Sequence, residues 1–207
     1  MIKFENTEVI GWEAAIRGMR NPMNSWEKSD SQYEFNDDEW PEYKVYPNDL
    51  ELMIKLAAGG PVHAKYRRMI PVTVDITAPL YWWKEYDTYK VGTVANSCST
   101  MHKIQAKEFT LDDFSHEHLS KMARETLVKT IQVLNMARKG FIDKKDKVYW
   151  WDMIQLLPSS YNQKRTVLLN YEVLTGIYPM RMAHKLDEWR ELCKWIETLP
   201  HAEEILS

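Results

Sequence analysis

The chain has 207 residues, of which 44% are hydrophobic, and its formal net charge at pH 7 is −3. This length and composition suit a single globular domain, which we expect to span 1–207. Positive and negative residues are interspersed, so the composition provides no basic face for generic nucleic-acid binding. The N-terminus lacks the blocks of a signal peptide, and no apolar run approaches the roughly 20 residues that span a bilayer. We therefore expect a cytoplasmic protein without a membrane segment.

The cysteines and histidines do not form a pattern typical of metal sites. Cys98 and Cys193 stand far apart and form no CxxC or Cys/His spacing, so neither a disulfide framework nor a zinc site is indicated. His116 and His118 would point to different sides of a helix. We expect no metal.

Aromatic residues are unusually frequent, with nine Trp and eleven Tyr. Two interpretations stay open. The rings fill a core or an oligomer interface, since large rings dominate burial at both, or they form stacking surfaces for a nucleobase or flavin.

The N-terminal half is predicted to contain a helix over 9–19, a long polar arm over 20–47 and a helix over 49–58. Asn48 and Glu51 form a capping-box pattern for that second helix, and Gly59 follows its end. The alternation over 69–77 predicts a strand, and Pro79 suits the first turn of a helix over 80–89. Residues 92–99 are predicted to form a loop.

The C-terminal half begins with a long amphipathic helix, capped by Thr110 with Asp113 or by Ser115, running to 139 and ended by Gly140. An apolar segment covers 148–156 and a strand 165–169. Asn170 is expected to cap a helix to 177, which Pro179 breaks, and a last helix covers 185–198. We therefore predict an α+β fold, helix-rich with a small sheet, comprising an arm (1–47), a core (48–199) and a tail (200–207).

The order of motifs over 63–101 resembles the flavin-dependent thymidylate synthases. In that family a histidine, here His63, precedes a strand that ends in Ala-Pro, here Ala78 and Pro79. The family then has Arg-His-Arg, where this chain has Thr88, Tyr89 and Lys90. In the ungapped alignment the family's later Asn-Glu falls on Ala95 and Asn96, and its second serine falls on Cys98. If the alignment is shifted by one residue, Asn96 and Ser99 instead align with the family's Asn and Ser.

A second block of the resemblance follows Leu157 and Pro158. Counted without gaps, Asn170 falls on the asparagine of the family's Asn-x-Arg, Glu172 on its arginine, and Arg181 on a further arginine that the family uses for substrate phosphate. Arg68 occupies the place of a family glutamate. The charges therefore differ from the family's at several positions, although the spacing is kept.

The resemblance implies a homotetramer that binds flavin (FAD) and deoxyuridylate between subunits. In the family a methylene group passes from methylenetetrahydrofolate to deoxyuridylate, reduced flavin supplies hydride, NADPH reduces the flavin, and no protein nucleophile is required. The protein binds phosphates, stacks rings and polarises the uracil. A carboxylate at Glu172 and the loss of Arg-His-Arg argue against FAD in its usual pose, because a diphosphate needs cations or N–H donors.

We predict that a nucleotide-type ligand binds at the cations and small polar groups left in this frame. They are His63, Arg67, Arg68, Lys90, Asn96, Ser97, Ser99, Asn170 and Arg181. Arg67 and Arg68 could equally form a solvated basic turn.

Four functions remain open at this stage. The first is a diverged member of the family that binds a nucleotide at a subunit interface without assured synthase activity. The second is a working synthase in which Lys90, Arg67, Arg68 and Arg181 replace the lost arginines. The third is a non-catalytic protein of viral (phage) type that sequesters a host nucleotide signal. The fourth is structural assembly.

Overall fold

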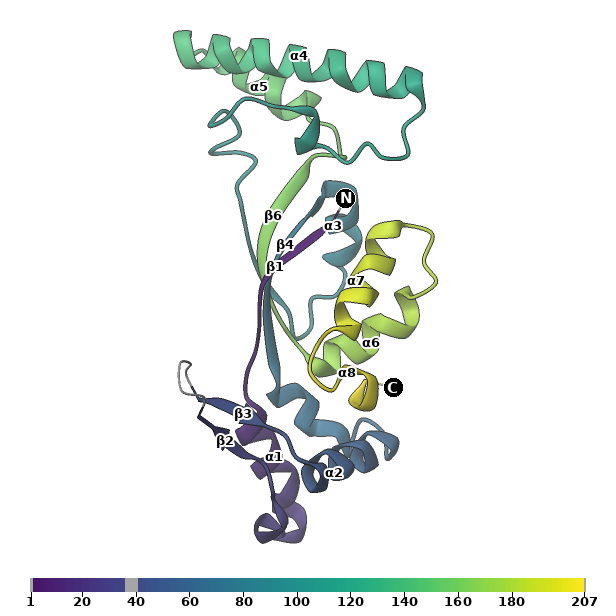
Figure 1. The fold of residues 1–207 in the computed structure, drawn as a ribbon. Helices are drawn as coiled ribbons and strands as arrows, with labels where there is room; N and C mark the ends of the chain where they lie inside the picture. The colour runs from purple at the N-terminus through teal and green to yellow at the C-terminus, as the bar shows by residue number, and fades with distance from the viewer. Residues whose placement is uncertain (1, 36–40, 207) are drawn as a thin grey trace. The chain divides into compact units, whose positions relative to one another are not determined.

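The computed structural model describes residues 2–35 and 41–206 (Figure 1). The contacts divide this part of the chain into two compact units. The first unit comprises 2–5, 75–89 and 95–166, and the second comprises 6–35, 41–74, 90–94 and 167–206. The single domain over 1–207 stays a prediction.

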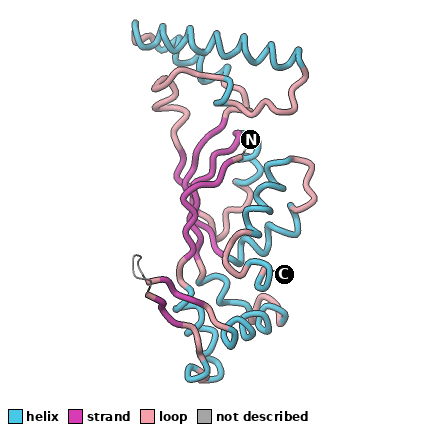
Figure 2. The backbone as a smooth tube through the Cα atoms, in the orientation of Figure 1, coloured by secondary structure: helices cyan, strands magenta, loops and turns pink. Residues whose placement is uncertain are grey.

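A four-stranded sheet has the strand order β1-β4-β6-β5, with the strands drawn in magenta in Figure 2. Its strands are β1 (Lys3–Val9), β4 (Pro71–Pro79), β5 (Val94–Ser97) and β6 (Asn162–Asn170). β4 alternates as its sequence predicts, because Val72, Val74 and Ile76 are fully buried while the residues between them are partly exposed. Helices form most of the remaining structure, so the predicted α+β fold with a small sheet is confirmed.

In the first unit, α4 (Lys121–Lys144) packs against α5 (Lys147–Leu156), and the two lie side by side in Figure 1. The side chain of Ser120 caps α4 by accepting a hydrogen bond from the backbone N–H of Ala123. Both helices contribute side chains to one apolar cluster. Its buried members are Ile104, Phe109, Phe114, Leu127, Ile131, Leu134, Ala137 and Met153.

The predicted limits of the long helix were wrong at both ends. Thr110 and Asp113 do form a capping box, but it closes the short 3-10 turn η4 (Leu111–Asp113), and Ser115 donates to Asn162 instead of capping a helix. Gly140 lies inside α4. A Cβ there would come within 2.7 Å of the Tyr149 ring, so glycine allows α5 to approach closely at this turn.

α3 (Leu80–Tyr86), also in the first unit, carries two fully buried tryptophans. The Trp82 and Trp83 rings meet edge-on with centroids 4.9 Å apart, and the Trp83 indole N–H donates to the carbonyl of Gln163. The Arg165 guanidinium stacks 4.2 Å from the Trp83 ring and pairs with Asp87 at 2.8 Å. For these tryptophans the packing interpretation is therefore the right one.

The second unit contains the remaining helices. They are α1 (Trp12–Arg20), the 3-10 turns η1 (Asn21–Met23), η2 (Trp26–Lys28) and η3 (Ala64–Met69), and the α-helices α2 (Pro47–Ala58), α6 (Tyr171–Arg181), α7 (Asp187–Glu197) and α8 (Ala202–Ile205). As predicted for the last long helix, Trp189, Leu192 and Ile196 are buried.

The described part of the polar arm contains two strands that its sequence does not predict. β2 (Gln32–Glu34) and β3 (Glu42–Lys44) pair antiparallel, with Tyr33 opposite Tyr43. The segment before them is fixed by a buried ion pair in which Arg20 Nε lies 2.6 Å from Asp49 Oδ1. The other carboxylate oxygen of Asp49 accepts from Ser29 Oγ and from the N–H groups of Asp30 and Ser31.

Three further sequence predictions need correction. The chain from Lys3 to Val9 forms β1, so the first helix begins only at Trp12. Within 92–99, β5 forms through pairing with β6, although its four residues are exposed and carry no apolar alternation. Pro179 lies inside the last turn of α6 and does not end it.

Candidate functional site

The turn η3 presents two consecutive arginines to different environments. Arg67 is 5% exposed, whereas the neighbouring Arg68 is exposed. Successive residues of a 3-10 helix are about 120° apart, so one side chain points inward and the next outward. η3 packs against α1, α2 and α6, and the Tyr66 hydroxyl fixes it to α2 by donating to the Met53 carbonyl at 2.9 Å.

The inward arginine carries donors that the described chain does not satisfy. Within residues 2–35 and 41–206, Arg67 Nε and Nη2 are buried and have no hydrogen-bond partner. The same holds for the Oε2 atom of Glu172, in the first turn of α6. Leaving a buried polar atom without a partner costs about 1–3 kcal/mol, and more for a charged group. Unsatisfied donors and an unsatisfied acceptor therefore occur at neighbouring elements.

The outward arginine faces the same glutamate. Arg68 Nη2 lies 3.9 Å from Glu172 Oε1, with the two side chains 61% and 25% exposed. Burial raises the pKa of the Tyr66 hydroxyl above its ordinary value, Arg67 opposes this shift through its charge and a hydrogen bond, and the charge of Glu172 adds to it. Both residues thus act electrostatically on Tyr66. We call Tyr66, Arg67, Arg68 and Glu172 the Arg–Glu cluster.

The start of α6 brings two more predicted positions to the Arg–Glu cluster. The Asn170 side chain caps α6 by accepting from the Val173 N–H at 3.1 Å, as its sequence predicts. The backbone N–H of Tyr171, the first residue of α6, donates to the Ile70 carbonyl at 3.2 Å. The loop that carries Lys90 passes over this turn. Gly92, with φ +77°, lies so close to Val173 that a Cβ would come within 2.9 Å of its side chain.

Two other predicted residues of the second unit lie elsewhere. His63 is exposed at the opposite end of η3, with its ring beside Gly59. Arg181 is at the far end of α6, roughly 14 Å along the axis from Glu172 at about 1.5 Å per residue. Its guanidinium lies 4.2 Å from the centre of the Trp189 ring. A ligand contact by either residue stays a prediction.

The three remaining predicted residues belong to the first unit. Asn96 and Ser97 are exposed on β5. Ser99 Oγ accepts from the N–H groups of Met101 and His102, which fixes a local turn. Ser99 also lines a cavity of about 710 Å³, where Lys107 pairs with Asp113 and Lys164 pairs with Glu5 and Asp75. Two of the three lysines that line this cavity are thus paired with carboxylates.

The sequence analysis did not include Glu172 or Tyr66 among the site residues. Glu172 was noted only as a charge unfavourable to flavin, and nothing in the sequence indicates that it meets Arg68 across the fold. A buried arginine cannot be recognised from sequence, because arginine is mostly exposed. The sequence contained one partial signal of this contact, because Arg68 and Glu172 each carry the opposite charge to the residue at that position in the family pattern.

The described residues include no group of three or more His, Cys, Asp or Glu side chains that could hold a metal ion. Of the two cysteines, Cys98 is exposed and Cys193 is buried, and burial raises the pKa of the Cys193 thiol to about 11. No helix in the described ranges is long and apolar enough to cross a membrane.

No protein-family model matches the sequence, and no curated protein matches it. The structure is similar to a flavin-dependent thymidylate synthase from Helicobacter pylori complexed with FAD and dUMP, with a TM-score of 0.66 and 15% identity over 99% of this chain and 96% of that chain. A second structure of the Helicobacter pylori synthase with FAD and dUMP gives a TM-score of 0.64 at 14% identity, covering 99% of this chain and 95% of that chain.

A UMP/dUMP methylase, PolB, from Streptomyces cacaoi bound with 5-Br dUMP gives a TM-score of 0.64 at 11% identity, covering 99% of this chain and 93% of that chain. At these identities the similarity shows the fold, which is that of the flavin-dependent thymidylate synthases.

Proposed function

We propose that this chain is a diverged relative of the flavin-dependent thymidylate synthases that binds a nucleotide-type ligand at a subunit interface. The Arg–Glu cluster at the start of α6 is its site. The observation that carries the proposal is Arg67, a 5% exposed arginine whose Nε and Nη2 have no partner in the described chain. The binding of dUMP or 5-Br dUMP by proteins of the same fold supports it.

Within this site the exposed cations are the residues that meet a phosphate. Arg68 is exposed at the rim of the Arg–Glu cluster, and Lys90 is exposed on the loop that crosses the start of α6. Guanidinium and ammonium groups are the usual partners of phosphate oxygens, and arginine can meet two oxygens at once. Arg67 and Glu172 lie deeper and are left for the neutral part of the ligand.

The residues of this chain do not fit the diphosphate of FAD. The segment that corresponds to Arg-His-Arg carries one cation, Lys90, and the arginine position in α6 carries Glu172, whose charge is only paired at 3.9 Å with Arg68. A carboxylate beside a diphosphate is repulsive. FAD is bound by the Helicobacter pylori neighbours, so it is the cofactor to test, but we do not propose the synthase reaction for this chain.

Calorimetry with a panel of nucleoside monophosphates tests the proposal. We expect one class to bind, and Arg68→Ala to weaken it by roughly tenfold or more, because a charge-assisted hydrogen bond contributes about 1.5–3 kcal/mol. The loss should be smaller at high salt, where screening already weakens the contact. Arg124→Ala, which removes an exposed arginine from α4, is the matched control and should bind as wild type does.

Two results would overturn parts of this proposal. If no nucleotide in the panel binds, the site is lost and the chain is a structural protein on this fold. If the protein forms thymidylate from dUMP when given methylenetetrahydrofolate, FAD and NADPH, it is a working synthase.

A further inference from the structure

Two donors and one acceptor of the Arg–Glu cluster lack hydrogen-bond partners in the described ranges. Arg67 Nε and Nη2 need acceptors, and Glu172 Oε2 needs a donor, since none of these atoms has a partner in the described ranges. The other carboxylate oxygen, Oε1, already faces Arg68. Buried polar groups of native proteins are almost always satisfied by protein, water or ligand. A group that satisfies this cluster must present a donor next to acceptors.

An anion does not meet this requirement. A phosphate would accept from Arg67, but it would leave Glu172 Oε2 without a donor and would be repelled by the carboxylate. A neutral edge of a nucleobase has donors and acceptors side by side. Carboxylates accept from the exocyclic amino group of cytosine, whereas arginine donates to ring nitrogen and carbonyl acceptors.

We propose that the Arg–Glu cluster binds an aminopyrimidine, so that the nucleotide this protein prefers carries cytosine rather than uracil. Because the three atoms are buried, the base enters only when the partly exposed Glu172 side chain turns outward. The amino group would then donate to Glu172 Oε2, and the ring nitrogen and carbonyl beside it would accept from Arg67. This inference rests on the proposed nucleotide function and specifies the base that the site takes.

Uracil fits the same atoms less well. It has a carbonyl where cytosine has the amino group, so its lone pairs would face the carboxylate. Its one N–H lies between two carbonyl oxygens, and a carboxylate that accepts from this N–H is repelled by both. By the resemblance, Glu172 stands where the family has an arginine. The site therefore offers a base a hydrogen-bond acceptor at this position in place of a donor.

The test compares dCMP and dUMP by calorimetry on the full chain. We expect dCMP to bind roughly ten- to a hundredfold more tightly, which is the usual discrimination of a well-placed pair against the wrong base. In Glu172→Gln an amide that can also donate replaces the carboxylate, so the preference should fall to within about threefold. Arg67→Met keeps the length of the side chain without its donors and should weaken both nucleotides.

The matched control is Glu191→Gln, which removes another glutamate of the same unit from an ion pair, with Lys194 at 2.7 Å. It should keep the wild-type ratio of dCMP affinity to dUMP affinity. Near-UV circular dichroism checks that each variant is folded. If Arg67→Met does not fold, the ratio in Glu172→Gln decides alone. Equal binding, or tighter binding of dUMP, overturns this inference and leaves the proposed function standing. Absence of binding by every nucleotide overturns the proposed function itself.

Discussion

Arg68 Nη2 lies 3.9 Å from Glu172 Oε1, and these are two positions at which the chain carries the opposite charge to the pattern it resembles. By that resemblance a glutamate belongs at Arg68 and an arginine at Glu172. The two departures from the pattern meet in one ion pair of this chain. The second carboxylate oxygen of Glu172 is a buried acceptor.

We predict that exchanging the two charges, in the double variant Arg68→Glu with Glu172→Arg, leaves the fold intact. The pair is partly exposed, so its contribution to the free energy of unfolding is within about 1 kcal/mol. Glu172→Arg alone should be less stable than the double variant, because it brings three guanidinium groups together. Urea unfolding of the single and double variants measures this. If the second substitution recovers no stability, the two side chains are not coupled.

We predict that the purified protein is colourless and takes up FAD weakly or not at all, because Lys90 is the one cation left in the Arg-His-Arg segment and Glu172 occupies an arginine position. Visible absorbance before and after addition of FAD measures this. The double variant with Thr88→Arg added places arginine at two family positions and moves the carboxylate from residue 172 to residue 68, so it should take up more FAD than wild type. Stoichiometric FAD in the wild-type preparation would contradict the prediction and favour a working enzyme.

The sequence was sufficient where local rules decide the structure. The strand β4 follows from its alternation, the end of α2 (Pro47–Ala58) from Gly59, and the start of α6 from Asn170, whose side chain caps the helix. These elements depend on neighbours within one or two turns of the chain. Even there, the cap of α2 differs from the prediction, since the Asn48 and Asp49 N–H groups donate to Asp30 from outside the helix.

The sequence was insufficient where distant segments decide it. β5 is four exposed residues without alternation, and it is a strand only because β6 pairs with it. The Arg–Glu cluster joins η3 to the first turn of α6, so the pairing of Arg68 with Glu172 depends on the packing of the two elements. The structure brings Arg68 to the first turn of α6, which Asn170 caps, but a pattern of residue types could not show which of the two arginines is buried.

We predict that Asn170→Ala lowers the free energy of unfolding by about 1 kcal/mol, because it removes the acceptor of the Val173 N–H at the start of α6. Asn170→Asp keeps an acceptor and adds a charge that is favourable at a helix N-terminus, so it should be close to wild type. Chemical denaturation of both variants measures the difference. Equal losses in the two variants would mean that the side chain acts through contacts other than capping.

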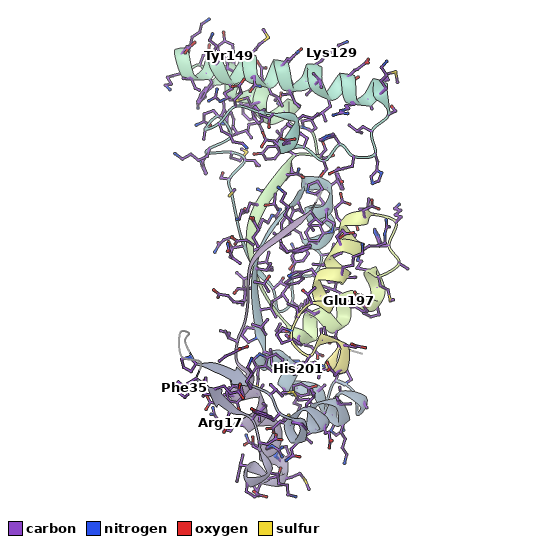
Figure 3. All side chains as sticks on the ribbon, in the orientation of Figure 1. Arg17, Phe35, Lys129, Tyr149, Glu197 and His201 are labelled. Atoms are coloured by element: carbon purple, nitrogen blue, oxygen red, sulfur yellow. The ribbon has the colours of Figure 1, made fainter. Side chains whose placement is uncertain are left out.

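We predict that the protein is a homo-oligomer, as the resemblance implies a tetramer, and that the outer face of α4 contributes to the interface. Met122, Val133 and Met136 fall on one side of this helix and are exposed, and Lys129 marks the same side in Figure 3. Light scattering should show a mass above that of the monomer, and Met122→Lys with Met136→Lys should lower it. Met23→Lys, at an equally exposed methionine in η1, is the control. A monomeric wild type at micromolar concentration contradicts both parts.

The buried ion pair between Arg20 and Asp49 should make stability depend on pH at the acid end. Burial raises the pKa of Asp49, but hydrogen bonds from Ser31, Ser29 and Arg20 together outweigh it and hold the pKa below its ordinary value. The unfolded chain therefore takes up this proton first, at about pH 3.9, as pH falls. The stability that Asp49 contributes is present above that pH and is lost as pH falls through the lower folded value.

We predict that Asp49→Asn lowers the free energy of unfolding by about 3–5 kcal/mol at pH 7, because it leaves the buried Arg20 without a counter-charge. Below about pH 4 the difference from wild type should narrow, since the unfolded wild-type chain then takes up a proton at Asp49 before the folded protein does. Urea unfolding at pH 7, 5 and 3 measures this, with the exposed Asp143→Asn as a control that stays within about 0.5 kcal/mol of wild type. A difference that is the same at all three pH values would show that Asp49 acts through its hydrogen bonds to Ser29, Asp30 and Ser31 and not through its charge.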